Sequence, residues 1–443
     1  MKKLPTFKRL PLSGLCLALF TSLSAPVFAS STSNQDVAKY ADQVEEDVIK
    51  WRRHFHQNPE LSNREFNTAK TIAKYLKDLG LEVQTGVAKT GVVAILDSGK
   101  PGPVVALRAD MDALPVVETS GLPFASTVRS EYNGADVGVM HACGHDTHMA
   151  MLMGAAQILV NMKDQLKGKV KFIFQPAEEG APEGEVGGAE VMVKEGVLSN
   201  PEVDVIFGIH ISSKVEVGTV RYREGGIMAA VDPFKIVVKG KQAHGAYPWH
   251  SVDPIVTSAQ IIMGLQTIVS RNVELIDSAA VVTVGKIEGG NRSNIIPNEV
   301  EMVGTIRSLN PVTREMIHQA VHNKATSIAQ SMNATAEVTL PLDYSYPITY
   351  NEPSLMREML PSLQASAGKE NVVPTNAVTG AEDFSFFQEK VPGLYLFVGG
   401  RSKDMTSEQA PSHHTPNFVI DESGMKTGVK LLSDLTIDYM NKH

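Results

Sequence analysis

The sequence contains little cysteine: among its 443 residues only Cys16 and Cys143 carry a thiol. It also has no excess of positive charge, since 49 acidic residues outnumber 41 basic ones and give a formal net charge of −8. This balance makes nucleic acid and anionic lipid surfaces poor partners. The sequence has no internal repeat, coiled-coil pattern or low-complexity tract, which excludes a repeat architecture and a disordered chain.

The N-terminal 29 residues differ in character from the rest. Four basic side chains stand among the first nine residues, an apolar run extends from Leu12 to Leu23, and small residues occur at Val27–Ala29. This pattern is typical of a secretory signal peptide. The apolar run is shorter than the roughly 20 residues that span a bilayer, so a membrane anchor is the less favoured alternative. We expect cleavage after Ala29, export to the periplasm or the medium, and no membrane attachment afterwards.

Cleavage would leave Cys143 as the one thiol of the mature chain. It would also remove four positive charges and no negative ones, which takes the formal net charge from −8 to −12. An exported protein with a single cysteine cannot form an internal disulfide. A thiolate bound to a metal would be protected, which favours a metal-ligand role for Cys143.

Apolar periodicity predicts an α/β chain that is interrupted by an insert. Residues Arg64–Leu79 have the period of an amphipathic helix, and Val92–Leu96 and Val104–Leu107 are short apolar runs typical of buried strands. Between about Gly226 and Tyr344 strands and helices are expected in the order βαββαβ, which is ferredoxin-like. We therefore predict a catalytic domain formed by residues 30–225 and 345–443 and an inserted domain of residues 226–344.

Chemically reactive side chains are densest in Met140–His148, directly before an apolar helix expected from about Met149. Cys143 and His145 are separated by one residue on a glycine-containing loop, so a thiolate and an imidazole can bind the same cation. Such ligands favour Zn, although Mn or Co also occupy sites of this kind. A Cys-x-His pair alone is equally consistent with a buried free cysteine beside hydrogen-bonded histidines, so further ligands must decide.

Further candidate ligands follow predicted strands. Asp110 follows one strand, Glu178 and Glu179 follow a second, and His210 ends a third. Sites in open α/β sheets lie outside the carboxyl ends of the strands, so these side chains are expected to meet. One glutamate of an adjacent pair can bind a metal while the other deprotonates a water. Taken singly, each motif is equally or better explained as a surface turn or a core histidine, but together they favour a site.

The predicted insert has polar residues of its own at His244, Asn294 and Arg307. Their side chains are suited to binding a substrate carboxylate and to stabilising an oxyanion. On this evidence alone, ordinary loop and strand-end polarity is the preferred explanation.

Five motifs occur in an order that resembles a known family: Arg108–Pro115, Met140–His148, Gln175–Gly180, Gly208–His210 and His414–Phe418. They resemble those of the aminoacylase and carboxypeptidase-G-like metallopeptidases, and in particular the hippurate hydrolase and auxin-conjugate amidohydrolase branch. The similarity extends from about Trp51 to the C-terminus.

This resemblance implies a zinc-peptidase-like catalytic domain with a mixed, largely parallel sheet and an insert that serves as lid and homodimerisation domain. It implies two divalent ions per subunit, Mn or Zn, held by Cys143, His145, Glu179, His210 and His414. His413 stands where the branch usually has an apolar residue, so His414 is the expected ligand.

The resemblance also implies the roles of the remaining residues. Glu178 would be the general base and Asp110 the acidic residue associated with the metals, although Arg108 stands where carboxypeptidase-like relatives have a metal-binding histidine. His244 would stabilise the oxyanion, often in the partner subunit's active site, and Asn294 and Arg307 would bind the substrate carboxylate.

The expected activity is hydrolysis of a small-molecule N-acyl amino acid by a metal-activated water. A dipeptidase or carboxypeptidase of the same architecture is the nearest alternative. Two others are a cysteine hydrolase that uses Cys143 as nucleophile and an exported metal- or ligand-binding protein without turnover.

Overall fold

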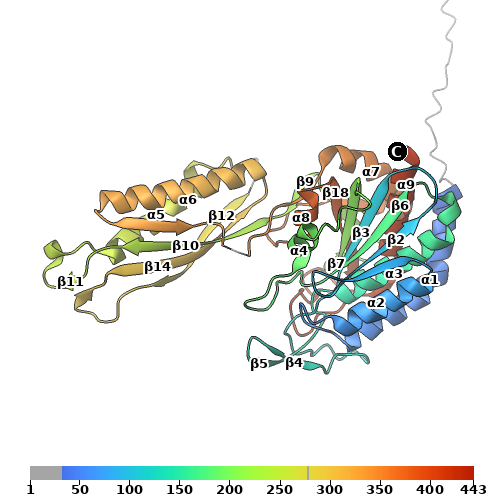
Figure 1. The fold of residues 1–443 in the computed structure, drawn as a ribbon, viewed down its shortest axis with the longest axis horizontal. Coiled ribbons are helices and arrows are strands. Elements are labelled where there is room, and N and C mark those ends of the chain that lie inside the picture. The colour runs from blue at the N-terminus through green and yellow to red at the C-terminus, as the bar shows by residue number, and fades with distance from the viewer. Residues whose placement is uncertain (1–31, 277–278, 343) are drawn as a thin grey trace, which may run out of the picture.

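The computed structural model describes residues 32–276, 279–342 and 344–443. It forms two bodies joined by extended segments, the smaller one being the insert (Figure 1). The predicted signal peptide, residues 1–29, lies outside the described residues. In the part of the chain that is described, no helix combines the length and the apolar character needed to cross a membrane.

The larger body is organised around an eight-stranded sheet. In spatial order its strands are β1 (Glu82–Val87), β2 (Gly91–Asp97), β6 (Lys169–Gln175), β3 (Val104–Asp110), β7 (Val205–Glu216), β18 (Gly393–Arg401), β8 (Val220–Tyr222) and β17 (Val372–Pro374). The central strands β6, β3, β7 and β18 are parallel, whereas β1, β2 and β8 pair with their inner neighbours in the antiparallel sense. The predicted mixed, largely parallel sheet is therefore confirmed.

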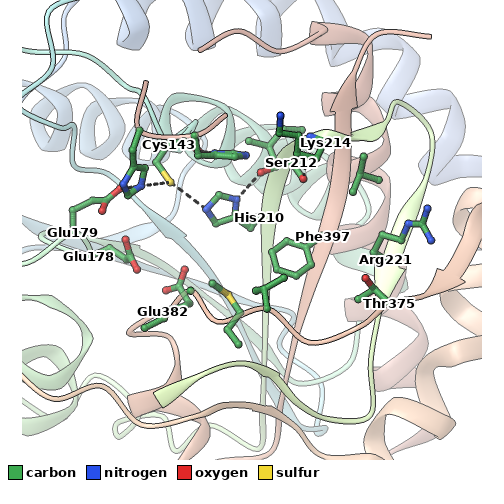
Figure 2. A pocket seen from close by; sticks show the side chains of 18 of the residues that line it. Cys143, Glu178, Glu179, His210, Ser212, Lys214, Arg221, Thr375, Glu382 and Phe397 are labelled. Atoms are coloured by element: carbon green, nitrogen blue, oxygen red, sulfur yellow. Dashed lines mark hydrogen bonds and ion pairs between the residues drawn. The ribbon is translucent and has the colours of Figure 1, made fainter. Parts of the chain in front are cut away.

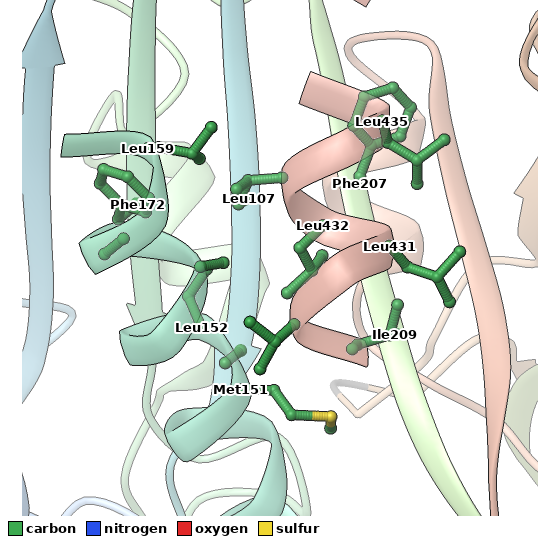
Figure 3. Packing of buried hydrophobic residues seen from close by; sticks show 14 of the residues in the cluster. Leu107, Met151, Leu152, Leu159, Phe172, Phe207, Ile209, Leu431, Leu432 and Leu435 are labelled. Atoms are coloured by element: carbon green, nitrogen blue, oxygen red, sulfur yellow. The ribbon is translucent and has the colours of Figure 1, made fainter. Parts of the chain in front are cut away.

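Five helices cover one face of this sheet: α1 (Thr32–Gln57), α2 (Phe66–Asp78), α3 (His145–Asn161), α7 (Pro353–Ala367) and α9 (Met425–Lys442). Figure 3 shows Leu152 of α3 and Leu432 of α9 packing on Leu107 and Phe207 of the strands. The opposite face is covered by α4 (Gly188–Lys194) and α8 (Ser385–Gln388). Burial on both faces explains why the central strands read as nearly continuous apolar runs.

The insert has a second, antiparallel sheet with two helices on it. Its elements are β10 (Ala230–Lys239), α5 (Pro254–Arg271), β12 (Ala280–Glu288), β14 (Glu299–Ser308), α6 (Pro311–Ser331) and β15 (Thr335–Thr339). The spatial order of the strands is β12-β14-β10-β15. Phe234 and Met302 from the sheet pack against Leu265 and Val321 from the helices. The observed order of elements is the βαββαβ order expected from the sequence.

Short elements complete the fold. One is a hairpin formed by β4 (Arg129–Tyr132) and β5 (Ala135–Gly138). The other two are small antiparallel pairs: β11 (Ala243–His244) with β13 (Ile295–Ile296), and β9 (Gly225–Met228) with β16 (Thr349–Asn351). The last pair joins the two connections between the bodies. Ile227 of β9 packs with Phe384 and Tyr395 in the larger body, so the first residues of the predicted insert belong to the catalytic core.

Candidate metal centre

The candidate ligands meet near the carboxyl ends of β3 and β6 and beside the middle of β7. His210 lies within β7 and does not end the strand as expected, because pairing with β18 extends β7 to Glu216. Cys143 precedes α3, and His145 is its first residue, so this helix begins at His145 rather than at Met149 as expected. The turn depends on Gly144, which has a φ of 94° and lies so close to Ile211 that an added Cβ would be 2.5 Å from its Cγ2 atom. Only glycine fits this conformation and this space.

The Cys143 thiol lies at the middle of the cluster. Its Sγ atom is 3.4 Å from His210 Nε2 and 3.3 Å from His414 Nε2 (Figure 2). His414 Nε2 is in turn 3.0 Å from Glu179 Oε1. Among the groups whose potential ligand atoms lie within 4.8 Å of one another, two contain the thiol. One consists of Cys143, His145 and His210, and the other consists of Cys143, Glu179 and His414. All five residues expected as ligands are thus brought together, with the thiol common to both groups.

The chemistry of these side chains fits divalent metal ions. His145 Nδ1 donates to the main-chain oxygen of Asp112 at 2.8 Å, which directs the lone pair of Nε2 into the cluster. This Nε2 atom is buried and has no hydrogen-bond partner among the described residues. Burial, together with the charges of Glu179 and Glu178, raises the pKa of the Cys143 thiol well above its usual value. A bound cation would reverse that effect, because it stabilises the thiolate.

Glu178 lies beside the two ligand groups. Its Oε2 atom is 3.9 Å from His145 Nε2, and burial followed by the negative charge of Glu382 raises the pKa of its carboxyl group well above the usual range. The main-chain oxygen of Glu178 accepts a hydrogen bond from the Tyr346 hydroxyl at 2.8 Å, which fixes this segment. A carboxylate with a raised pKa, held near a metal-bound water, is suited to general base catalysis.

Asp110 uses both carboxylate oxygens in hydrogen bonds. Oδ1 accepts from His148 Nδ1 at 2.6 Å, and Oδ2 accepts from Arg108 Nη1 at 2.8 Å. His148 Nε2 accepts from the main-chain N–H of Ile211 at 2.8 Å, so this imidazole joins β3 to β7. Asp110 Oδ2 lies 3.8 Å from His145 Nε2. The geometry gives Asp110 an orienting position at the edge of the cluster. It also identifies His148, for which the sequence predicts no role, as the partner of Asp110.

Arg108 forms ion pairs with three buried carboxylates. Besides Asp110, its guanidinium contacts Glu382 Oε1 and Asp383 Oδ1, both at 2.9 Å, and its Nε donates to Gln175 at 2.8 Å. Nothing in the local sequence around Glu382 and Asp383 predicts this role, because Arg108 is 274 residues from Glu382. The sequence signal present is that Glu382 and Asp383 are adjacent carboxylates in a segment that follows Gly380.

His413 supports the loop that carries the thiol. Its Nδ1 donates to the main-chain oxygen of Cys143 at 3.0 Å, and its Nε2 accepts from the Ser213 N–H at 3.2 Å. Burial lowers the pKa of this imidazole to about 3, so the ring is neutral. Both nitrogens are thereby used, and His414, not His413, faces the cluster.

The polar residues of the insert lie apart from this centre. His244 belongs to β11, at the far end of the insert in Figure 1, and its side chain is exposed. Arg307 contacts Thr305 and the main-chain oxygen of Ile306. Neither these two residues nor Asn294 lines the cavity beside the metal centre. Within one described chain the structure therefore does not bring the expected insert residues to the ligands.

A cavity of about 540 Å³ opens beside the ligands. Cys143, Glu178 and Glu179 stand at one part of its wall, and Phe397 and Met228 provide an apolar part. Its volume suits a small organic molecule.

Residues 106–438 match the model of peptidase family M20/M25/M40. The chain belongs to this family. Thermostable carboxypeptidase 2 of Saccharolobus solfataricus is 43% identical over 401 residues, which cover 90% of this chain and 97% of the relative. IAA-amino acid hydrolase ILR1-like 2 of Arabidopsis thaliana is 37% identical over 435 residues, 97% of this chain and 94% of the relative. A crystal structure of a dinuclear metal binding peptidase of the M20 family from Bacillus subtilis superposes with a TM-score of 0.75 at 34% identity, covering 91% of this chain and all of that one.

This M20 protein is an enzyme that hydrolyses amide bonds with the help of metal ions. The family and the enzyme class expected from the sequence are confirmed, and a ligand-binding protein without turnover is disfavoured. The fold of the larger body is likewise that of its M20 neighbours.

Proposed function

We propose that the protein hydrolyses N-acyl amino acids to a carboxylic acid and an amino acid. The carrying observation is that Glu178 lies beside the two ligand groups that contain Cys143 and lines a cavity of small-molecule size. The relative named for hydrolysis of IAA-amino acids supports this class of substrate.

The ligand set would hold two divalent ions, Mn or Zn, which lower the pKa of a bound water and polarise the substrate carbonyl. Glu178 would accept a proton from the attacking water and would return it to the leaving nitrogen. His148 links Asp110 of β3 to Ile211 of β7 beside the ligands, and Arg108 forms ion pairs with Asp110, Glu382 and Asp383. The walls of the cavity position the substrate next to Glu178.

We assign His244 to stabilisation of the oxyanion, and Asn294 and Arg307 to binding of the substrate carboxylate, through a movement of the insert or through a partner subunit. Either route is needed because these residues lie apart from the ligands in one chain. A homodimer formed through the insert would supply them in trans. Light scattering at micromolar concentration tests this, and a monomeric mass would contradict it.

We also propose that the protein is exported and that its signal peptide is removed. The mature protein begins after Ala29 and resides in the periplasm or the medium. Determining the N-terminus of protein collected outside the cytoplasm tests it, and an intact Met1 there would contradict it.

The alternative function, that of a carboxypeptidase or dipeptidase, is supported by the 43% identity to a protein named carboxypeptidase. The deciding experiment follows amino-acid release from N-acetyl, N-benzoyl and indole-acetyl amino acids and from dipeptides, before and after chelation and return of Mn or Zn. Release from the acylated compounds supports the proposal. Release from dipeptides alone would replace it with the alternative.

A further inference from the structure

Three residues of different chemistry form one row across neighbouring strands. His210 of β7 is the register partner of Phe397 of β18, and Phe397 is the register partner of Arg221 of β8. Register partners project from the same face of a sheet, and adjacent strands are about 4.8 Å apart, so the Cα atoms of Arg221 and His210 are separated by about 10 Å. Phe397 therefore lies between the candidate metal ligand His210 and the cationic side chain of Arg221.

All three residues line the cavity described above. The rings of His210 and Phe397 have their centroids 6.2 Å apart, and Met228 and Val378 add apolar wall near Phe397. Figure 2 shows Arg221 and Thr375 on the far side of Phe397 from Cys143 and Glu179. The cavity therefore has a metal-binding end, an apolar middle and a cationic far end.

The cation at the far end is free to bind a ligand. Among the described residues the Arg221 guanidinium has neither an ion-pair nor a hydrogen-bond partner. The other basic residue of the cavity, Lys214, differs, because its Nζ donates to the main-chain oxygens of Ser407 and Ala410. A half-buried guanidinium without a counter-ion is suited to a carboxylate, which it can bind through two parallel hydrogen bonds.

We propose that Arg221 forms a carboxylate subsite, and that the enzyme prefers N-acyl amino acids whose acyl group ends in a second carboxylate beyond an apolar spacer. A spacer of about one benzene ring or a few methylenes fits the distance set by the two inter-strand steps. The inference rests on the proposed function, because it assigns the cavity to the acyl group and leaves the amino-acid carboxylate to the insert.

The test compares N-(4-carboxybenzoyl)glycine with N-benzoylglycine. The wild-type enzyme should show a higher kcat/KM for the carboxylated substrate. Arg221→Met should lower the ratio of the two kcat/KM values by about 10- to 100-fold, mainly through KM, because a charge-assisted hydrogen bond is lost. Arg221→Lys should restore part of the ratio. Arg271→Met, at an exposed position at the end of α5, is the matched control and should leave the ratio unchanged.

A second comparison identifies the source of the carboxylate. If Arg221 instead binds the carboxylate of the amino acid, Arg221→Met lowers kcat/KM equally for the substrates with either acyl group. The kcat/KM for N-benzoylglycinamide, which lacks that carboxylate, is then the same in Arg221→Met and the wild type. That result would overturn the assignment to the acyl end. An unchanged ratio together with unchanged rates would overturn the subsite altogether.

A binding measurement separates this inference from the proposed function. If the wild-type enzyme releases no glycine from any of these substrates, the proposed function fails. Calorimetry with terephthalate and benzoate still tests the subsite. Tighter binding of terephthalate that Arg221→Met abolishes supports it, and equal binding of the two acids to the wild-type enzyme overturns it.

Discussion

Arg108 Nη2 lies 2.9 Å from Glu382 Oε1, although the two residues are 274 positions apart in the chain. The same guanidinium contacts Asp110 and Asp383, and all four side chains are almost fully buried. One cation thus faces three carboxylates next to the candidate metal ligands. Tyr395 donates to the second oxygen of Glu382 and completes the group.

Replacing this cation should be costly. Arg108→Met removes the cation that three buried carboxylates share, and we expect the free energy of unfolding to fall by about 3–5 kcal/mol. Urea denaturation measures the change. Arg129→Met, which breaks an exposed ion pair with Asp136, is the control and should change the free energy of unfolding by less than about 1 kcal/mol. Equal effects of the two substitutions would contradict the role given to Arg108.

Glu178→Gln should separate catalysis from metal binding. The amide cannot accept the water proton, so we expect kcat to fall by about 10²- to 10⁴-fold. Metal content after dialysis should stay at the wild-type level, because the ligands are untouched. Near-normal turnover would remove Glu178 from the role of general base.

Chelation distinguishes a metal enzyme from a cysteine hydrolase. We expect a chelator to abolish activity and Mn or Zn to restore it, since the water is activated by metal. Cys143→Ser should lower metal content as well as activity. Activity that survives chelation but is lost on alkylation of Cys143 would instead support a thiol nucleophile.

His148 should influence metal affinity without binding a metal itself. His148→Gln disturbs the hydrogen bonds to Asp110 and to the Ile211 N–H, and we expect a 10- to 100-fold weaker affinity for the metal. Titration with a competing chelator measures it. His54→Gln, at an exposed position on α1, is the control. An unchanged affinity in His148→Gln would show that this imidazole has no influence on the metal site.

Asp434 of α9 predicts a pH dependence of stability that is independent of the active site. Burial raises the pKa of its carboxyl group from 3.8 to about 7. The folded state therefore holds a proton that the unfolded state releases, so stability from this group is complete below about pH 4 and declines as the pH rises to about 7.

Asp434→Asn should remove this decline. We expect the variant to match the wild type at pH 4 and to be more stable at pH 8, by at most about 4 kcal/mol. Thermal or urea denaturation at both pH values measures it. Asp404→Asn, in an exposed loop, should show no such difference, and a pH-independent effect of Asp434→Asn would refute the assignment.

The parts of the site that the sequence predicts are those encoded locally. Asp110, Glu178 and His210 each follow an apolar run, and parallel strands bring such positions together whatever the rest of the chain does. The order of elements in the insert is also encoded locally and could be predicted, because each strand and helix has its own apolar period. The start of α3 was misplaced because His145 is polar yet buried, which periodicity cannot indicate.

The parts that could not be predicted depend on distant partners. β8 consists of three residues, Val220–Tyr222, and is a strand only because it pairs with β18 and β17. Arg221 therefore had no visible context in the sequence. The partners of Arg108 were hidden in the same way, since the chain returns to them only after the insert.

The ligands are also ordered in time when the chain is made. Cys143 and His145 emerge early, whereas His414 is 271 residues beyond Cys143 and stands near the C-terminus. The strand that precedes it, β18, fills the gap between β7 and β8 and so closes the sheet late. A nascent chain that has not yet reached His414 consequently lacks one wall of the candidate metal centre.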